Sequence, residues 1–191
     1  MEHPRLPGLL SAVEWEAAFA PYEEGTYVAA LQWLSANDVV LDIGAGDLRF
    51  ARRAAQCVRR VIALEQHAEL IPAVLPANVQ VICGDARQLP FPSGVTVGVL
   101  LMRHCQHIAL YANKLRAAGA RHLITNARWK MGVERMDLLA PRWPFTTTQG
   151  QWYACACGAV GFQPGPPYAL TAHTLEQVVE VADCPQCRPM V

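Results

Sequence analysis

Four cysteines near the carboxyl end of the chain have the residue type and the spacing of metal ligands. They form two close pairs: Cys155 with Cys157, and Cys184 with Cys187. Both thiolates of a close pair can reach the same ion, and 26 residues separate the two pairs. Four thiolates make the tetrahedral coordination that is typical of structural zinc. The pattern therefore predicts a zinc site built from all four cysteines.

The second cysteine pair has the Cys-Pro-x-Cys form of a zinc knuckle, whose turn directs backbone amides at the sulfurs. Together the two pairs resemble a zinc ribbon, although the one-residue spacing of the first pair is less usual. Disulfides are the alternative, and they are disfavoured in a cytosolic chain. A redox pair is disfavoured because these cysteines do not lie on a strand-to-helix turn. His173 stays an alternative ligand.

A loop with two glycines follows the first strand expected in the chain. Asp42 lies near the end of that strand, and Gly44 and Gly46 let a ligand approach the backbone closely. A dinucleotide fingerprint needs a third glycine where this chain has Arg49, which disfavours NAD. Asp47 opposes a pyrophosphate at the helix start but suits a ligand that carries a sulfonium and an ammonium group. The loop therefore favours S-adenosylmethionine as the cofactor.

The acid-x-Gly-x-Gly pattern of this loop resembles the first motif of the class I S-adenosylmethionine-dependent methyltransferases. The resemblance extends over residues 39–126, because Glu65 ends the second expected strand and the segment Cys-Gly-Asp-Ala at 83–86 follows the third. It implies a doubly wound, Rossmann-like α/β fold and an enzyme that transfers a methyl group. Leu48 departs from the pattern, since many members have a further glycine at this position.

The same resemblance implies which residues hold the cofactor. The loop at residues 42–46 would lie against the methionine part of the ligand. Glu65 would accept hydrogen bonds from the ribose hydroxyls. Asp85 would accept a hydrogen bond from the adenine amino group, and the backbone N–H of Ala86 would donate to the adenine ring.

The loop after the fourth expected strand is unusually polar, and the resemblance places methyl transfer beside it. His104 is predicted to be a general base, because imidazole titrates near neutral pH; a helix-capping histidine is the alternative. Arg103 is predicted to anchor an anionic group of the substrate, with a solvated arginine as the alternative. Cys105 is interpreted as a small buried thiol, because methyl transfer needs no covalent enzyme intermediate. His107 beside His104 does not predict a metal, since no further ligand completes the set.

The methyl acceptor stays open between RNA and a small molecule. Eight Lys or Arg stand against two acids over residues 103–142, and Trp129 and Trp143 offer stacking faces. This stretch is either a solvated surface or a contact for a phosphate or carboxylate of the substrate. The whole chain has 16 basic and 16 acidic residues, and a net charge of zero disfavours a whole-surface nucleic-acid binder. The signatures of amino-group methylation on bases and of cytosine carbon methylation are absent.

Short apolar runs and helical patterns alternate along the middle of the chain and must position these residues. Buried strands are expected at 39–43, 61–64, 79–83, 95–101 and 123–125, and helices around 48–55, 70–74 and 108–119. A capping box of Ser11 and Glu14 predicts an earlier helix, and a second leads up to residue 37. Repeated βαβ units predict an open, doubly wound parallel sheet. Two β-like stretches, 151–153 and 175–181, accompany the cysteines.

These patterns divide the chain into three parts. We expect an N-terminal helical segment (1–38), a Rossmann-like core that binds S-adenosylmethionine (39–145), and a zinc-ribbon-like element (146–191) packed on or completing the core sheet. The main hypothesis is a methyltransferase. One alternative is a non-catalytic binding module whose zinc ribbon docks on RNA or protein, and an NAD-dependent oxidoreductase is a disfavoured third.

Location in the cell is predicted from what the chain contains. The longest strongly apolar run, 95–102, is shorter than the roughly 18 residues of a membrane helix. The amino-terminal residues do not have the pattern of a secretory signal, because Glu14 and Glu16 interrupt them. Seven cysteines, an odd number, indicate free thiols and a reducing compartment. We therefore expect a cytoplasmic protein without a membrane partner.

Overall fold

Two β-sheets organise the described part of the chain, which comprises residues 11–19, 22–128 and 132–187 of a computed structural model. The helices are α1 (Ala12–Phe19), α2 (Glu24–Leu31), α3 (Arg49–Ala54), α4 (Ile108–Ala117) and α5 (Ala172–Glu176). The strands of the larger sheet are β1 (Val39–Ile43), β2 (Arg60–Glu65), β3 (Val79–Cys83), β4 (Val97–Leu100), β5 (His122–Thr125) and β6 (Glu134–Asp137). The smaller sheet contains β7 (Gln151–Cys155), β8 (Val160–Gln163) and β9 (Val178–Val181). Short 3-10 turns are η2 (Ala68–Leu70), η4 (Phe145–Thr147) and η5 (Pro167–Ala169).

The larger sheet has the strand order β3-β2-β1-β4-β5-β6. Strands β1 to β5 are parallel, and β6 pairs antiparallel with β5 at the edge. The order reverses between β1 and β4, because the chain runs outward from β1 to β3 and then returns to the other side. Open α/β sheets bind ligands beyond the carboxyl ends of the strands at such a switch point. The predicted doubly wound α/β fold is confirmed.

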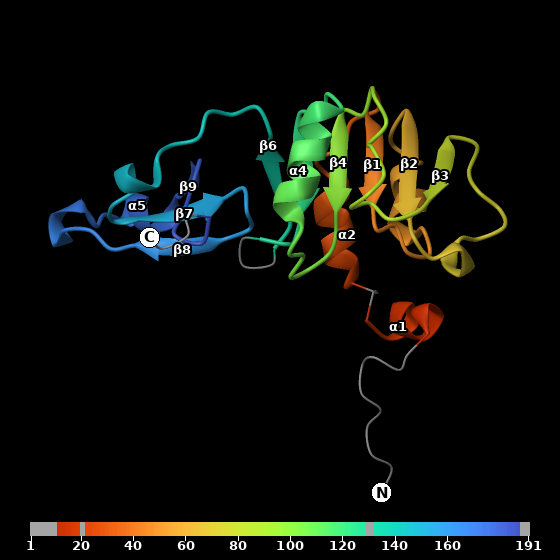
Figure 1. Cartoon of the computed structure of the whole chain (residues 1–191), viewed down its shortest axis with the longest axis horizontal. Helices are drawn as coiled ribbons and strands as arrows, with labels where there is room; N and C mark the ends of the chain where they lie inside the picture. The colour runs from red at the N-terminus through yellow and green to blue at the C-terminus, as the bar shows by residue number, and fades with distance from the viewer. Residues whose placement is uncertain (1–10, 20–21, 129–131, 188–191) are drawn as a thin grey trace, which may run out of the picture.

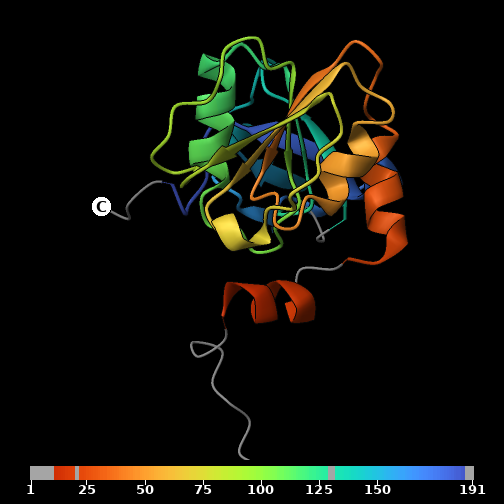
Figure 2. The same cartoon turned by 90° about the vertical axis from the view of Figure 1, so that its right-hand side faces the viewer.

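Helices cover both faces of this sheet, and the strand residues alternate between two cores. Val40 faces the core that includes Tyr27 of α2 and Ala51 of α3. Its neighbour Leu41 faces the opposite core, which includes Leu115 of α4. Figures 1 and 2 show the resulting three layers, with α4 on one side of the sheet and α2 and α3 on the other. Burial on both faces explains why these strands read as continuous apolar runs.

Three local expectations need correction. The helix expected at 70–74 is wrong: only the turn η2 forms, because Pro72 follows Ile71 and favours the extended backbone that Ile71 adopts. The β-like stretch at 175–181 begins as helix α5, whose capping box joins Thr171 and Thr174, and becomes strand β9 only at Val178. Strand β6 escaped prediction, because its four residues are polar or charged apart from Met136 and occupy a sheet edge. The expected capping box of Ser11 and Glu14 is confirmed at the start of α1.

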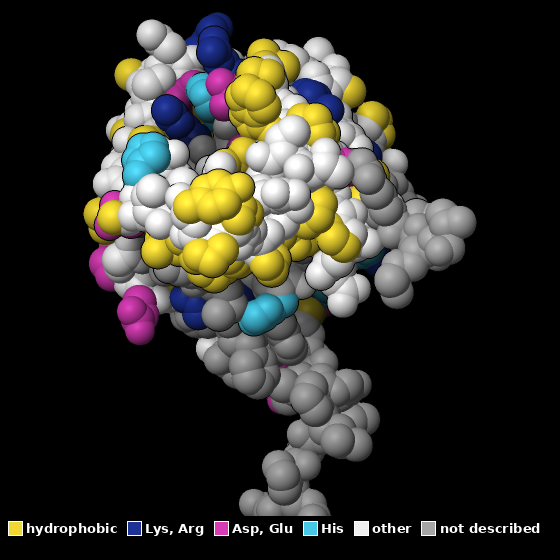
Figure 3. Space-filling view, turned by 90° about the vertical axis from the view of Figure 1, so that its left-hand side faces the viewer, with side chains coloured by type: hydrophobic (Ala, Val, Ile, Leu, Met, Phe, Trp, Pro, Cys, Tyr) yellow, Lys and Arg dark blue, Asp and Glu magenta, His cyan; other side chains and the backbone are white. Residues whose placement is uncertain are grey.

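The smaller sheet stands at the end of the larger one, beyond β6 (Figure 1). Strand β7 is central, with β8 antiparallel and β9 parallel to it. The segment before this sheet joins it through a bridge from Trp143 to Val181. The outer surface of this end carries several apolar side chains (Figure 3). Tyr168 and Leu170, which precede α5, and Leu175 of α5 are exposed.

Candidate functional site

A cavity of about 520 Å³ opens at the carboxyl edge of β1, β2 and β3. Its lining includes Gly44 and Gly46 after β1, Glu65 at the end of β2, and Asp85 and Ala86 after β3. Adjacent strands of a parallel sheet end at the same edge about 4.8 Å apart, so three loops distant in sequence meet there. The structure thus brings together five of the residues that the sequence assigned to the cofactor.

The loop after β1 has the backbone that two glycines permit. Gly44 and Gly46 both have positive φ, 71° and 55°. A Cβ at Gly44 would lie 2.9 Å from the methyl carbon of Met102, and a Cβ at Gly46 would lie 2.5 Å from a carboxylate oxygen of Glu16. Leu48 also has positive φ (65°) and is fully buried, so the leucine at this family-variable position adopts the left-handed backbone that suits glycine.

Glu65 is buried and already holds two backbone groups. Its Oε2 accepts a hydrogen bond from the Gly46 N–H (2.8 Å), and its Oε1 accepts one from the His67 N–H (2.9 Å). The carboxylate therefore joins the end of β2 to the glycine loop after β1. Each carboxylate oxygen has a second lone pair, so these contacts leave acceptor capacity towards the cavity.

Asp42 is not among the residues that line the cavity. The side chain is buried, and its Oδ2 has no hydrogen-bond partner among the described residues. Burial raises the pKa of Asp42 to about 7, and the negative charge of Glu65 adds to the rise. Glu65 lines the cavity, and Asp42 is near enough to interact with it, so the two acids favour a cationic ligand there.

The turn after β3 is fixed by two cations. Arg87 grips the Asp85 carboxylate through its backbone N–H and its guanidinium, at distances of 2.8 to 3.0 Å. These bonds lower the pKa of Asp85. Lys114 of α4 donates to the carbonyl oxygens of Ala86 (2.6 Å), Arg87 (2.8 Å) and Leu89 (2.7 Å). All three ammonium donors of Lys114 are therefore engaged with this turn, a role that counting charges along the sequence did not reveal.

The negative charge of Asp47 is largely paired with Arg49, which the sequence did not indicate. Its carboxylate accepts hydrogen bonds from the Arg49 Nε and Nη2 atoms, both at 2.7 Å. Burial raises the pKa of Asp47, but the bonds from Arg49 outweigh it and the net shift is downward. Arg49 also contacts Glu16 of α1 (3.3 Å), a residue that lines the cavity and that the sequence did not single out.

The loop after β4 places its two histidines differently. His107 lines the cavity beside Tyr111 and Met102, with a ring-centroid distance of 6.3 Å to Tyr111. His104 is exposed, has positive φ (61°), and is not among the residues that line the cavity. The Arg103 guanidinium lies 4.9 Å over the ring of Tyr22, and its backbone N–H donates to the Tyr22 hydroxyl. The predicted catalytic roles of His104 and Arg103 stay predictions.

Cations of the basic stretch are mostly engaged with other parts of the chain. Besides Lys114, Arg121 faces Asp137 (3.7 Å) and the Arg135 guanidinium lies 4.8 Å over the Trp33 ring. Trp143 is 61% exposed, whereas Trp129 falls outside the described residues.

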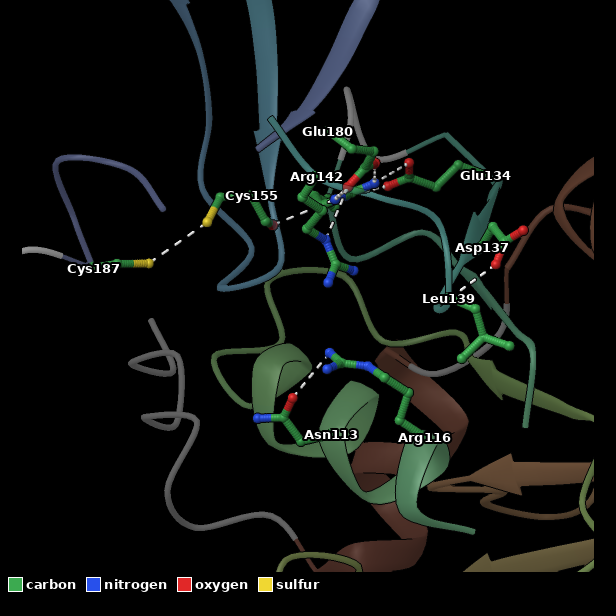
Figure 4. Close-up of polar contacts among 10 residues, drawn as sticks. Asn113, Arg116, Glu134, Asp137, Leu139, Arg142, Cys155, Glu180 and Cys187 are labelled. Atoms are coloured by element: carbon green, nitrogen blue, oxygen red, sulfur yellow. Dashed lines mark hydrogen bonds and ion pairs between the residues drawn. The ribbon is translucent and has the colours of Figure 1, made fainter. Parts of the chain in front are cut away.

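A buried arginine joins the two sheets. Arg128 follows β5 and donates to Glu134 of β6 (2.8 and 2.9 Å) and to Glu180 of β9. Figure 4 shows the carboxylates of Glu134 and Glu180 close to one another. Arg128 also donates to the Cys155 carbonyl oxygen (3.4 Å). Burial lowers the pKa of Arg128, but the bonds to both carboxylates raise it above the ordinary value. Composition gave no sign of this network, because its members come from three distant segments.

The four carboxyl-terminal cysteines converge on one point. Their sulfur atoms all lie within 4.8 Å of one another, and no other group of metal-binding type gathers in the part of the chain that the structure describes. The Sγ separations are 3.5 Å for Cys155–Cys187, 3.6 Å for Cys157–Cys184 and 3.7 Å for Cys184–Cys187. A tetrahedral ion with Zn–S bonds of 2.3 Å would set sulfurs about 3.8 Å apart. All four thiols are free, and the predicted four-cysteine cluster is confirmed.

A doubly wound sheet with a Gly-x-Gly loop after β1, an acid at the end of β2 and another after β3 is the arrangement of an α/β domain that binds a nucleoside-like ligand. Residues 41–128 match the family described as "Methyltransferase domain". Over this segment the chain matches a methyltransferase domain, and the predicted resemblance to the class I methyltransferases is confirmed there. The match also supports the prediction of an S-adenosylmethionine-dependent enzyme.

Three solved structures illustrate what the fold is similar to. A precorrin 8W decarboxylase from Methanobacterium thermoautotrophicum is 22% identical, with 55% of this chain and 63% of that chain covered and a TM-score of 0.46. A dimethyladenosine transferase from Plasmodium falciparum is 18% identical (54% and 41% covered, TM-score 0.47). A putative methyltransferase from Bacillus halodurans is 20% identical (53% and 50% covered, TM-score 0.46). This chain thus spans less than two thirds of each of these structures. A search of curated protein sequences found no match.

Among the described residues, every helix is too short or too polar to cross a bilayer.

Proposed function

We propose that this chain binds S-adenosylmethionine in the cavity at the sheet edge and transfers its methyl group to a small-molecule acceptor. The observation that carries the proposal is that residues at or just after the ends of three successive strands line one cavity of about 520 Å³: Gly46, Glu65 and Asp85. The cofactor supplies a methyl group already activated by a sulfonium. The protein then accelerates transfer chiefly by alignment and by excluding water.

The proposed roles follow the order of the strands. Glu65 accepts hydrogen bonds from the ribose hydroxyls while it keeps its bond to the Gly46 N–H. Asp85, held by Arg87, accepts from the adenine amino group, and the Ala86 N–H donates to the ring. Buried Asp42 stabilises the positive end of the ligand from below the loop.

The acceptor side is formed by the loop after β4. His104 remains our proposed base and Arg103 the proposed anchor for an anionic group, and both require the exposed loop to turn towards the cavity. His107 already lines the cavity, so it is the competing base. Each histidine takes a proton from the acceptor only when that acceptor must lose one.

A small acceptor is favoured over RNA by the state of the basic residues. Lys114 is fully engaged by three carbonyl oxygens, and Arg128 is buried between two carboxylates. Cations held in this way cannot release counterions from a phosphate backbone. Methylation of purified RNA in place of small metabolites would overturn this part of the proposal.

The cofactor assignment is tested by titration calorimetry with S-adenosylmethionine and with NAD. We expect binding of the first and none of the second, and Asp85→Ala should weaken that binding about tenfold. Release of S-adenosylhomocysteine on incubation with cell extract then separates an enzyme from a binding module. If the chain binds the cofactor but releases no S-adenosylhomocysteine with either fractionated small molecules or RNA, the non-catalytic module is favoured.

We also propose that the four cysteines hold one structural zinc ion and that the protein is cytoplasmic, where its seven thiols stay reduced. Elemental analysis should find one zinc per chain. Cys184→Ser should lose the metal and make residues 151–187 sensitive to protease, because metal binding contributes folding energy. The matched control is Cys57→Ser, since that thiol is exposed and outside the cluster. Equal zinc content in both variants would contradict the assignment.

A further inference from the structure

Helix α1 lies across the carboxyl edge of the sheet, outside the segment that matches the methyltransferase family. Both views of the fold place it beneath the ends of the strands (Figures 1 and 2). Among the side chains of α1 that the structure describes, those of Ala12 and Glu16 line the cavity. This helix therefore closes part of a site whose other walls belong to the sheet loops.

Glu16 is the residue of α1 that reaches the glycine loop. Its Oε1 lies 3.3 Å from Arg49 Nη2 and 3.5 Å from the Asp47 N–H, both longer than the 2.7 Å bonds that join Arg49 to Asp47. Its carboxylate fills the space above Gly46, and the side chain is only 12% exposed. Burial raises the pKa of Glu16 despite these contacts. The Glu16 carboxylate is thus partly desolvated on the cavity wall. Its contacts to Arg49 and to the Asp47 N–H are long, and Arg49 also binds Asp47.

The position of Glu16 along the cavity indicates which part of the ligand it meets. Asp85 follows β3, Glu65 ends β2, and Gly46 follows β1 in a sheet with the order β3-β2-β1. If adenine lies at Asp85 and ribose at Glu65, the next strand spacing of about 4.8 Å brings the amino-acid part of the ligand to the glycine loop. Glu16 contacts that loop at Gly46 and Asp47.

We propose that Glu16 binds the ammonium group of the amino-acid part of the cofactor, and that this contact holds α1 against the site when the cofactor is bound. The inference rests on the proposed function. A carboxylate offers about four acceptor positions, and the two long contacts of Glu16 leave room for a charged donor. A charge-assisted bond to an ammonium, at about 2.8 Å, would be shorter than either contact that Glu16 makes here, and partial desolvation strengthens it.

The test compares three ligands on the full-length chain by calorimetry. S-adenosylmethionine and S-adenosylhomocysteine both carry the amino-acid ammonium, whereas methylthioadenosine keeps the adenosine part and lacks it. Glu16→Gln should weaken the first two about tenfold or more and leave methylthioadenosine within about twofold. Glu176→Gln, an exposed carboxylate on α5, is the matched control and should change none of the three.

A second measurement uses the unmodified chain. Amide hydrogen exchange over residues 12–19 should slow when S-adenosylhomocysteine binds and stay unchanged with methylthioadenosine, because only the former engages Glu16. Two results would overturn the inference while cofactor binding by the parent stands. Glu16→Gln could weaken the binding of all three ligands equally, or it could leave the affinity for all three unchanged. A parent chain that binds none of them refutes the proposed function, and this inference with it.

Discussion

Replacing Arg128 by methionine removes the charge that joins the two sheets. The arginine side chain is 1% exposed, and its two carboxylate partners, Glu134 and Glu180, are 22% and 33% exposed. Removing one partner of a fully buried ion pair costs about 3–5 kcal/mol, because the remaining charge is left without compensation. Here both carboxylates can regain water after the substitution. We therefore expect a smaller loss of about 2–3 kcal/mol in the free energy of unfolding.

A chain of this size shifts its melting temperature by about 2–4 °C per kcal/mol, so Arg128→Met should lower it by about 4–12 °C. Urea unfolding monitored by circular dichroism gives the free energy, and calorimetry gives the melting temperature. The free energy of unfolding of Arg128→Lys should lie between those of the parent and Arg128→Met, because lysine keeps the charge but cannot form the bidentate bonds of a guanidinium. The control is Arg121→Met, whose side chain is 67% exposed and faces Asp137 at 3.7 Å; it should cost under about 0.5 kcal/mol. Equal losses for Arg128→Met and Arg121→Met would refute the reasoning.

Three further predictions concern the cavity. For Asp42, a pKa raised to about 7 means that the folded state binds more protons than the unfolded state between about pH 4 and 7, so stability falls as pH rises through that window. Asp42→Asn should remove this pH dependence. In urea unfolding of ligand-free protein at pH 8, the variant should be more stable than the parent by about 2–4 kcal/mol. The same dependence of stability on pH in both proteins would contradict the prediction. Lys114→Met should weaken cofactor binding about tenfold in calorimetry, because three carbonyl oxygens lose their donor and the turn that carries Asp85 loosens. On an identified acceptor that must lose a proton, whichever of His104→Ala and His107→Ala removes the base should lower turnover roughly a hundredfold without changing cofactor affinity, and a change under threefold excludes that histidine.

The strands of the core and their doubly wound parallel arrangement were predicted from local patterns. Runs such as Val39–Ile43 pack against helices on both faces, so every residue except Asp42 is apolar, and a continuous apolar run of this kind can be recognised in a single sequence. Strand β6 could not be predicted in this way, because an edge strand is half solvated and has no continuous apolar run. Its strand conformation depends on hydrogen bonds to β5. The same limit applied to residues 70–74, where the extended preference before Pro72 outweighed helical spacing.

The sequence by itself determined the chemistry that depends on residues close together in the chain. The glycine loop after β1, the acids at the strand ends and the two cysteine pairs each carry their signal within a few residues, and the sheet topology places strand ends at one edge. Only the tertiary structure decided the contacts made across long separations. Glu16 reaches a loop 30 residues away, Lys114 closes the turn after β3, and Arg128 binds carboxylates on both sheets. A charged side chain has many partners within its reach once the chain folds, and the burial that selects one of them is a property of the whole packed molecule.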